Sequence, residues 1–235
     1  MGYWGQQNLS GVQLRARDDL RLKITTGQYR TIANPCAICE KGAEPTVQID
    51  KVIAKVDRYG IPTQTVMCNQ CGMLRTDPVF RDSDYSDFYK YHYRELYSGL
   101  VEASNDFFEE QVKRGKQLRK LISNHTNLSG KTIIEVGTGA GGILQGVVGD
   151  DADGIGCDFG FSYLKFAQSK SMRVFQGSIN SLPDNSADVL IYSHVLEHIA
   201  NPKVEISEMF RVLKNDGLVV IVVPGVYSIH RHYGG

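Results

Sequence analysis

The chain has 235 residues, of which 42% are hydrophobic and 22% are charged. This composition is typical of a globular protein with room for one sizeable domain and a smaller one. Lysine and arginine together number 26, as do aspartate and glutamate, so the net charge is zero. The balance argues against nucleic acid as the main partner, because proteins that bind nucleic acid usually carry a basic excess.

The N-terminal stretch does not resemble a targeting signal. "MGYWGQQNLS" has neither the basic segment nor the apolar run of a secretory signal peptide. No apolar run along the chain approaches the roughly 20 residues that a helix needs to span a bilayer. We therefore expect a cytoplasmic protein without a membrane span.

Residues 1–80 are predicted to form a zinc-binding segment. Four of the five cysteines lie in two pairs, "CAIC" at Cys36 and Cys39 and "CNQC" at Cys68 and Cys71. A C-x-x-C turn directs two thiolates at one point, and two such turns complete a tetrahedral shell of four cysteines. Because this shell leaves no open coordination position, the predicted Zn²⁺ is structural rather than catalytic.

The alternatives to zinc are two disulfides or free buried thiols. Disulfides are disfavoured in a reducing cytosol, and thioredoxin-like chemistry needs only one C-x-x-C. Gly42 and Gly72 follow the two pairs and would let backbone amides turn towards the sulfurs. Residues 46–59 and 63–68 have the pattern of short strands, which favours a zinc ribbon that folds around its metal. No element is predicted for residues 1–35, whose periodicity is weak.

Residues 81–103 are predicted to form a tyrosine-rich link. Five tyrosines crowd this stretch: Tyr85, Tyr89, Tyr91, Tyr93 and Tyr97. Tyrosine offers a flat apolar face and a hydroxyl, which suits a polar ring-shaped ligand. The alternative is an aromatic packing seam between two domains, since five tyrosines cannot all face one ligand.

Residues 104–235 alternate helix and strand patterns. A helix with an N-cap at Ser104 or Asn105 comes first, because apolar residues then recur at helical spacing. Strands are predicted at 132–136, 154–158, 172–177, 187–193 and 217–224, and further helices at 161–170 and 202–213. This alternation predicts an α/β fold whose parallel sheet is covered on both faces.

The stretch "IIEVGTGAGGIL" joins the first predicted strand to a helix, where such sheets bind ligands. Three glycines have the G-x-G-x-x-G spacing of a dinucleotide-binding loop: Gly137, Gly139 and Gly142. Four residues equally fit E-x-G-x-G-x-G: Glu135, Gly137, Gly139 and Gly141. Asp158 ends the second strand, where a carboxylate can accept from both hydroxyls of a ribose. NAD and S-adenosylmethionine (SAM) both contain adenosine, so these residues suit either ligand.

Three features favour SAM over NAD. Glu135 stands where dinucleotide motifs usually have a small apolar residue. Residues 175–225 resemble the middle of class I SAM-dependent methyltransferases, with "LP", "LEH", "NP" and "LKNDG" in the family's order. In the last motif, Asp216-Gly217 stands where the family usually has Gly-Gly. The C-terminal region also lacks the second nucleotide-binding half that an NAD enzyme should have.

From Cys36 to Pro224 the chain resembles bacterial methyltransferases with an N-terminal four-cysteine zinc motif, among them C-methyltransferases of nucleotide-linked deoxysugars. "CGMLRTDP" and the tyrosine-rich link belong to this resemblance. It implies a Rossmann-like class I methyltransferase sheet with a small N-terminal zinc ribbon. The family sheet has seven strands and this chain reaches only the fifth, so we expect a truncated product or fragment that lacks the last two strands.

The same resemblance implies the ligand contacts. Four loop residues would surround the methionine part of SAM: Gly137, Thr138, Gly139 and Gly141. Glu135 would act on its amino group, and Asp158 would hold the ribose. Three residues would lie beside the adenine: Phe159, Ser178 and Ile179. The family often has an acid where Ser178 stands.

His198 and His194, at the carboxyl end of the fourth predicted strand, are the predicted general bases of methyl transfer. His230 and His232 follow the fifth strand and are further candidates, although a lone histidine is more often structural. "HVLEH" also matches the H-x-x-E-H motif of a class of zinc proteases, which needs a third ligand well downstream. In a milder variant, Glu197 and His198 bind a divalent ion near the substrate.

The predicted function is SAM-dependent methyl transfer to a small polar acceptor, with a nucleotide-linked sugar or glycan precursor favoured. A methyltransferase acting on another metabolite is one alternative. The other is a catalytically inactive module that binds SAM or is organised by zinc for an interaction. Formation of S-adenosylhomocysteine separates the active classes from the inactive one.

Overall fold

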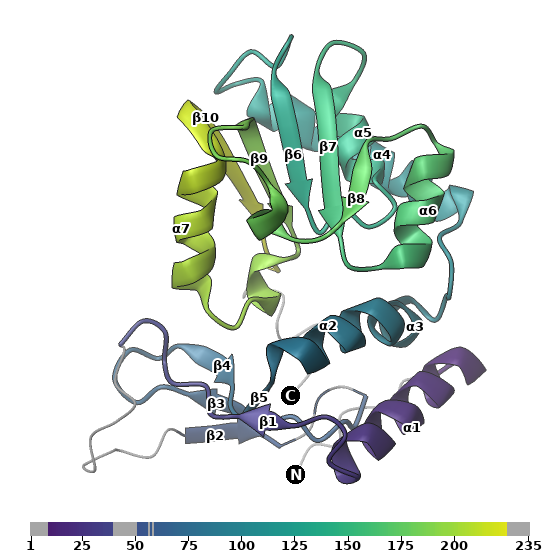
Figure 1. Cartoon of the computed structure of the whole chain (residues 1–235), viewed down its shortest axis with the longest axis vertical. Helices are drawn as coiled ribbons and strands as arrows, with labels where there is room; N and C mark the ends of the chain where they lie inside the picture. Colours follow the sequence, from purple (N-terminus) through teal and green to yellow (C-terminus); the bar gives the residue numbers. More distant parts are fainter. Residues whose placement is uncertain (1–8, 40–50, 56, 58, 225–235) are drawn as a thin grey trace. The chain divides into compact units, whose positions relative to one another are not determined.

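The computed structural model describes residues 9–39, 51–55, 57 and 59–224. These residues divide into two compact units (Figure 1). One contains the described residues up to Leu100 together with Ala200–Lys203, and the other contains Val101–Ile199 and residues 204–224. None of the described helices combines the length and apolar character needed to cross a membrane.

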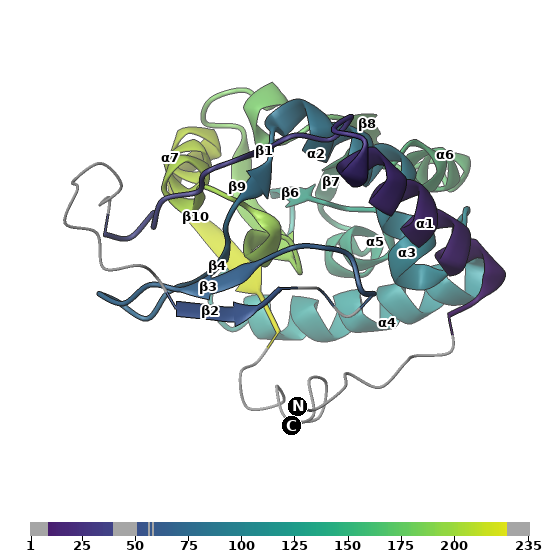
Figure 2. The ribbon, with the colours of Figure 1, turned by 90° about the horizontal axis from the view of Figure 1, so that it is seen from below.

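The N-terminal unit consists of short strands and three helices. Its elements are α1 (Gly11–Thr25), β1 (Thr31–Ile32), β2 (Lys51–Ala54), β3 (Thr65–Met67), β4 (Leu74–Thr76), β5 (Val79–Phe80), α2 (Asp82–Tyr91) and α3 (Tyr93–Ser98). β2, β3 and β4 lie side by side as an antiparallel sheet, which Figure 2 shows clearly. The strands predicted near residues 46–59 and 63–68 therefore appear as β2 and β3, while residues 46–50 lie outside the described residues.

Helix α1 occupies a stretch for which the sequence analysis predicted no element. Its start is fixed by a capping box: the Gln13 backbone N–H donates to Ser10 Oγ (3.3 Å) and the Ser10 N–H donates to Gln13 Oε1 (2.9 Å). Only Ala16 and Leu20 of this helix are buried, which explains its weak periodicity. They pack in the core of the unit with Tyr29, Ile61, Phe80 and Leu96.

The tyrosine-rich stretch forms α2 and α3, within the N-terminal unit. Four of its tyrosines recur every four residues and form a ladder of ring contacts: Tyr85, Tyr89, Tyr93 and Tyr97. Centroid distances along the ladder are 6.2, 5.2 and 5.5 Å. Tyr85 packs against the core of the unit, whereas Tyr97 is 54% exposed. The ladder thus runs from the core to the surface.

The second unit contains the predicted α/β sheet. Its elements are α4 (Asn105–Ile122), β6 (Thr132–Val136), α5 (Gly142–Val148), β7 (Asp153–Asp158), α6 (Phe161–Ser169), β8 (Val174–Gln176), η1 (Ile179–Ser181), β9 (Ala187–Ser193), η2 (Leu196–His198), α7 (Pro202–Val212) and β10 (Leu213–Val222). The strand order is β10-β9-β6-β7-β8, and every neighbouring pair is parallel. The predicted fold class is therefore confirmed.

β10 begins four residues before its predicted start at residue 217. Leu213 already pairs with Ala187, and the regular ladder resumes at Leu218 after an irregularity. Asp216 lies inside that irregularity with a φ of 61°. Aspartate tolerates this left-handed conformation better than most residues, which explains how it can stand where the related sequences usually have glycine.

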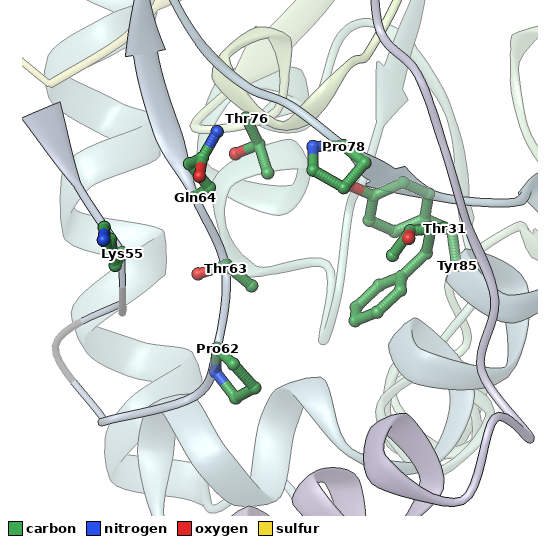
Figure 3. Close-up of a pocket in the computed structure, with 9 residues that line it drawn as sticks. Thr31, Lys55, Pro62, Thr63, Gln64, Thr76, Pro78 and Tyr85 are labelled. Atoms are coloured by element: carbon green, nitrogen blue, oxygen red, sulfur yellow. The ribbon is translucent and has the colours of Figure 1, made fainter. Parts of the chain in front are cut away.

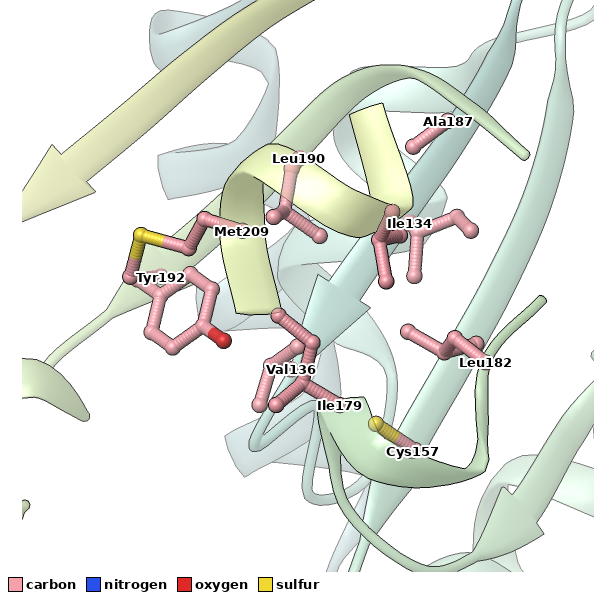
Figure 4. Close-up of a cluster of buried hydrophobic side chains, with 10 residues drawn as sticks. Ile134, Val136, Cys157, Ile179, Leu182, Ala187, Leu190, Tyr192 and Met209 are labelled. Carbon is pink, nitrogen blue, oxygen red and sulfur yellow. The ribbon is translucent and has the colours of Figure 1, made fainter. Parts of the chain in front are cut away.

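The sheet is apolar on both faces because its residues alternate between two cores. On one face, Ile134, Val136, Leu190 and Tyr192 pack with Met209 and Val212 of α7 (Figure 4). On the other, Ile133, Val189 and Ile191 pack with Leu144 and Val147 of α5 and Ile122 of α4. This two-sided burial is what a parallel sheet requires. Glu135 lies in the middle of β6 on the α5 face.

Helices α4 and α5 approach closely through glycines. A Cβ atom on Gly146 would lie 2.8 Å from the Gly115 Cα and the Lys116 nitrogen and would also overlap the Val112 carbonyl oxygen. These are backbone atoms, so no flexible side chain can yield. The pairing of the two helices fixes α5, the helix that the glycine loop enters.

We therefore expect Gly146→Ala to lower the free energy of unfolding of the second unit by about 1–3 kcal/mol, the usual cost of overpacking. Thermal and urea unfolding followed by circular dichroism measure the loss. Gly11→Ala is the control, because a Cβ there meets only the end of the Arg15 side chain at 3.6 Å. Equal stability of the two variants would contradict the close packing described.

Candidate functional site

The predicted ligand residues gather at the carboxyl edge of the parallel sheet. The glycine loop follows β6, Asp158 ends β7, Ser178 follows β8 and the segment His194–His198 follows β9. These four strands are consecutive neighbours in the sheet. Since parallel strands end at the same edge, the fold brings together residues from four separate parts of the sequence.

Glu135 ties the glycine loop to the start of α5. Its side chain is buried, and Oε2 accepts hydrogen bonds from Thr138 Oγ1 (2.7 Å) and the Leu144 backbone N–H (3.1 Å). The sequence analysis did not anticipate this role. The motif spacing contains the signal, because Thr138 follows three residues later and can reach back across a tight turn. A buried acid at this point favours a cationic ligand group over an anionic one.

Asp158 holds the loop from the neighbouring strand. Its Oδ2 accepts from the Gly139 backbone N–H (2.8 Å), and its Oδ1 accepts from the Gly160 N–H (2.7 Å). In a dinucleotide-binding loop, backbone amides of this kind bind the pyrophosphate. Here the Gly139 amide already has an anionic partner. A carboxylate at the end of this strand is also a residue type that accepts from ribose hydroxyls.

The loop glycines have conformations that other residues rarely adopt. Gly137 and Gly141 have φ angles of 72° and 82°. A Cβ on Gly137 would collide with the Val195 side chain, and one on Gly141 would collide with that of Met172. The Gly137 N–H also donates to the Cys157 carbonyl (2.8 Å). Turn geometry and packing thus both demand glycine, whether or not a ligand is bound.

The three residues predicted beside the adenine have different surroundings. Phe159 is 37% exposed, and its carbonyl accepts from Gln176 Nε2 (3.1 Å). Ser178 is half-buried at the start of the turn after β8. Ile179 is completely buried in the core on the α7 face. Its side chain packs into the core beneath the turn and has no exposed surface for a ligand to contact.

His194 and His198 both lie directly after β9. His194 has a φ of 56°, its backbone N–H donates to the Val222 carbonyl (2.8 Å), and its Nδ1 lies 3.4 Å from Glu197 Oε1. Non-glycine residues in this conformation are concentrated at functional sites. Both histidines are exposed at the carboxyl edge. His230 and His232 lie outside the described residues.

Among the described residues, a protease-type zinc site with three ligands is not found at the H-x-x-E-H segment. Within the described part of the chain, the four paired cysteines are the one group of three or more histidine, cysteine, aspartate or glutamate side chains whose ligand atoms converge. His198 also ends a single 3-10 turn, η2, and not the long helix on which such protease motifs lie.

The sulfur atoms of the four paired cysteines all lie within 4.8 Å of one another. Cys36 Sγ is 3.6 Å from Cys71 Sγ, and Cys39 Sγ is 3.9 Å from Cys68 Sγ. A tetrahedral zinc ion with Zn–S bonds of about 2.3 Å requires sulfurs about 3.8 Å apart. The residues therefore fit zinc. The cluster is compatible with the predicted ribbon, while Cys157 lies buried in the other unit.

The second cysteine pair occupies the turn between β3 and β4. The Cys68 N–H donates to the Met73 carbonyl and the Gly72 N–H donates to the Cys68 carbonyl, both at 2.9 Å, and Gly72 has the positive φ expected of it. Backbone N–H groups of Cys71 and Gln70 lower the pKa of the Cys68 thiol to about 7. Hydrogen bonding to Cys71, followed by burial, raises the pKa of Cys39 to about 12. A bound cation would stabilise all four cysteines as thiolates, because its positive charge offsets the repulsion between neighbouring negative sulfurs. Gly42 lies outside the described residues.

Substitutions of Glu135 should separate its hydrogen bonds from its charge. Glu135→Ala leaves the Leu144 N–H and the Thr138 hydroxyl without their buried acceptor, and we expect it to lower the free energy of unfolding by about 1–3 kcal/mol. Glu135→Gln keeps one carbonyl oxygen for both donors and should lose less. Urea unfolding of the two variants tests this order, and the reverse order would show that the loop does not depend on that acceptor.

Comparison with known proteins finds one family match and several similar structures. Residues 134–221 match the family described as "Methyltransferase domain". A putative SAM-dependent methyltransferase from Methanococcus maripaludis is similar at 17% identity and a TM-score of 0.44, over 49% of this chain and 57% of that one. A SAM-dependent methyltransferase from Archaeoglobus fulgidus is similar at 24% identity and a TM-score of 0.44, over 52% and 58%.

The chain thus spans a little over half the length of these two structures. A comparison with curated proteins finds no match. The family match covers β9 entirely, the last three residues of β6 and all but the last residue of β10. It also contains the glycine loop, Asp158 and both histidines after β9. Residues 134–221 are therefore similar in sequence to methyltransferase domains.

Proposed function

We propose that this protein transfers a methyl group from SAM to a small polar acceptor, and that the acceptor is a nucleotide-linked sugar or another glycan precursor. The observation that carries the proposal is the pair of acids that hold the glycine loop, Glu135 and Asp158. SAM carries a sulfonium and an ammonium group, whereas NAD places a pyrophosphate at such a loop. Two acids in contact with the loop favour the cation.

Different residues around the loop would contact different parts of SAM. Gly137, Thr138, Gly139 and Gly141 would border its methionine part, as the family resemblance implies. Asp158 would accept from the ribose hydroxyls, and the partly exposed ring of Phe159 would lie on the adenine. Ser178 and the backbone at Ile179 would complete the edge. Glu135 would act on the ammonium group while it keeps the loop in shape.

Bound SAM would supply an activated methyl group. The residues of this chain then have to align the acceptor atom with that methyl and remove a proton. A bond forms between the acceptor atom and the methyl carbon as the bond from carbon to sulfur breaks. His198 or His194 takes the proton that the acceptor atom loses. The Glu197 carboxylate beside His194 would stabilise the protonated imidazole.

The acceptor class rests on two observations. The zero net charge gives no general attraction for nucleic acid. The tyrosine ladder presents aromatic faces and hydroxyls, and Tyr97 in the ladder and Tyr91 outside it are each more than half exposed. Such groups suit a sugar ring. Tyr85, at the other end of the ladder, instead packs on the core of the N-terminal unit.

Replacement of either predicted base should lower turnover and leave SAM binding intact. We expect His198→Asn or His194→Asn to reduce the rate of S-adenosylhomocysteine formation by about 10²-fold or more, the usual contribution of a general base. The assay uses a panel of nucleotide-linked sugars as acceptors, and calorimetry measures SAM affinity. His125→Asn is the control, since His125 is exposed after α4.

Two outcomes contradict this part of the proposal. If both substitutions behave like His125→Asn while the natural sequence turns over, the base lies elsewhere. If the protein binds SAM and methylates none of the sugars but does methylate another metabolite, the acceptor class is wrong. Binding of SAM without turnover on any acceptor indicates the inactive module.

We further propose that the four paired cysteines bind one structural zinc ion. The distances between sulfurs fit a tetrahedral shell, and the four sulfurs leave no position for a substrate. The metal would join the turn after β1 to the turn between β3 and β4. It would thereby hold together a unit whose described strands are at most four residues long.

Metal analysis should find one zinc ion per chain, and Cys68→Ala should lose it. Removal of zinc with a chelator should unfold the N-terminal unit first, because metal binding and folding are coupled in small domains. Proteolysis followed by mass spectrometry locates the unfolded part. Cys157→Ala is the matched control and should keep its zinc. The proposal fails if freshly reduced protein contains no metal and its paired cysteines form disulfides.

A further inference from the structure

The N-terminal unit contains a pocket of about 320 Å³ whose described lining shares no residue with the glycine loop or the edge of the parallel sheet. Six of its side chains carry polar atoms: Thr31, Lys55, Thr63, Gln64, Thr76 and Tyr85. Two prolines and a phenylalanine complete the wall. Figure 3 shows that these residues come from strands, loops and a helix well separated in sequence, arranged around one space.

The walls of the pocket are held by hydrogen bonds and by the core of the unit. Asp57 Oδ1 accepts from the Tyr59 N–H (2.9 Å) and the Ile61 N–H (2.8 Å), which fixes the loop that leads to Thr63. The Asp77 N–H donates to the Gln64 carbonyl (3.0 Å). On the opposite wall, the rings of Phe80 and Tyr85 meet edge to face with centroids 5.5 Å apart. A pocket with braced walls needs little reorganisation to receive a ligand.

The chemistry of the lining selects a class of ligand. Among the described residues that line the pocket, Lys55 is the one charged side chain and none is an acid. Three threonine hydroxyls, an amide and a phenol can donate to or accept from ligand hydroxyls. Burial raises the pKa of Tyr85, which keeps its hydroxyl neutral. The aromatic and proline faces suit the C–H face of a sugar ring, and the volume is at the small end for ligand pockets.

We propose that this pocket binds a sugar-sized, hydroxyl-rich ring that carries a single acidic group, either a phosphate or a carboxylate. Lys55 pairs with the acidic group and the threonines and Gln64 bind the ring hydroxyls. The idea that this pocket holds the methyl acceptor rests on the proposed function. Binding of a sugar in the pocket can be tested whether or not the protein transfers methyl groups.

Calorimetric titrations of the full chain test the proposal. Glucose 1-phosphate and glucuronate are the acidic probes, glucose is the neutral ring and inorganic phosphate is the acid without a ring. We expect at least one acidic sugar to bind about tenfold or more tightly than glucose or phosphate. The better of the two acidic sugars identifies the acidic group. Lys55→Gln should remove that preference, and Lys55→Arg should retain it.

Lys113→Gln, on the exposed surface of α4, is the matched control for loss of one positive charge and should bind like the natural sequence. The proposal is overturned if no acidic sugar binds, if phosphate alone binds equally well, or if Lys55→Gln leaves affinity unchanged. A separate titration with SAM distinguishes the two proposals. If the chain binds an acidic sugar but not SAM, only the proposed function is contradicted. If it binds SAM but no acidic sugar, only the pocket proposal is contradicted.

Discussion

A buried acid at the centre of the sheet organises the candidate active site. Glu135 lies on β6 among apolar neighbours and accepts from the hydroxyl of the loop residue Thr138 and from the amide of Leu144 in α5. These bonds connect strand, loop and helix. The position of α5 depends in turn on its close packing against α4 through Gly115 and Gly146. The shape of the loop therefore follows from contacts inside the domain.

A second acid extends this arrangement across the sheet. Asp158 accepts from Gly139 in the loop and from Gly160 after its own strand. The glycine spacing alone is also compatible with a dinucleotide, because glycines indicate only that the backbone turns tightly. Glu135 is the acid that bears on the choice of ligand, because dinucleotide loops usually have a small apolar residue at its position, whereas an acid at Asp158 suits the ribose of either ligand. The two carboxyl groups thus hold the loop in its observed shape, and the proposed preference for SAM rests on Glu135.

Much of this arrangement could be predicted from the sequence, and the failures have physical reasons. Residues 132–136 and 187–193 alternate apolar side chains between two cores, so their strands were predicted at the bounds observed for β6 and β9. α1 was missed because it buries only Ala16 and Leu20 and its periodicity is weak, although Ser10 and Gln13 form a recognisable capping box. The pocket around Lys55 could not be predicted, because its walls come from segments that only tertiary structure brings together.

Some features of the site residues could likewise be predicted from the sequence and others could not. The convergence of the four cysteine sulfurs follows from two C-x-x-C turns and was predictable. The burial of Ile179 was not, since the resemblance places that position beside a ligand and only the packing shows its side chain in the core. The hydrogen bonds of Glu135 depend on the tight turn that returns Thr138 to β6.

The central claim is that the loop selects a cationic sulfonium ligand. Isothermal titration calorimetry of the chain against SAM and against NAD⁺, under identical conditions, tests it most directly. The account predicts saturable binding of SAM and, for NAD⁺, affinity weaker by about two orders of magnitude or undetectable, since a pyrophosphate beside two carboxylates is repelled. Binding of NAD⁺ as tight as that of SAM, or tighter, would contradict it.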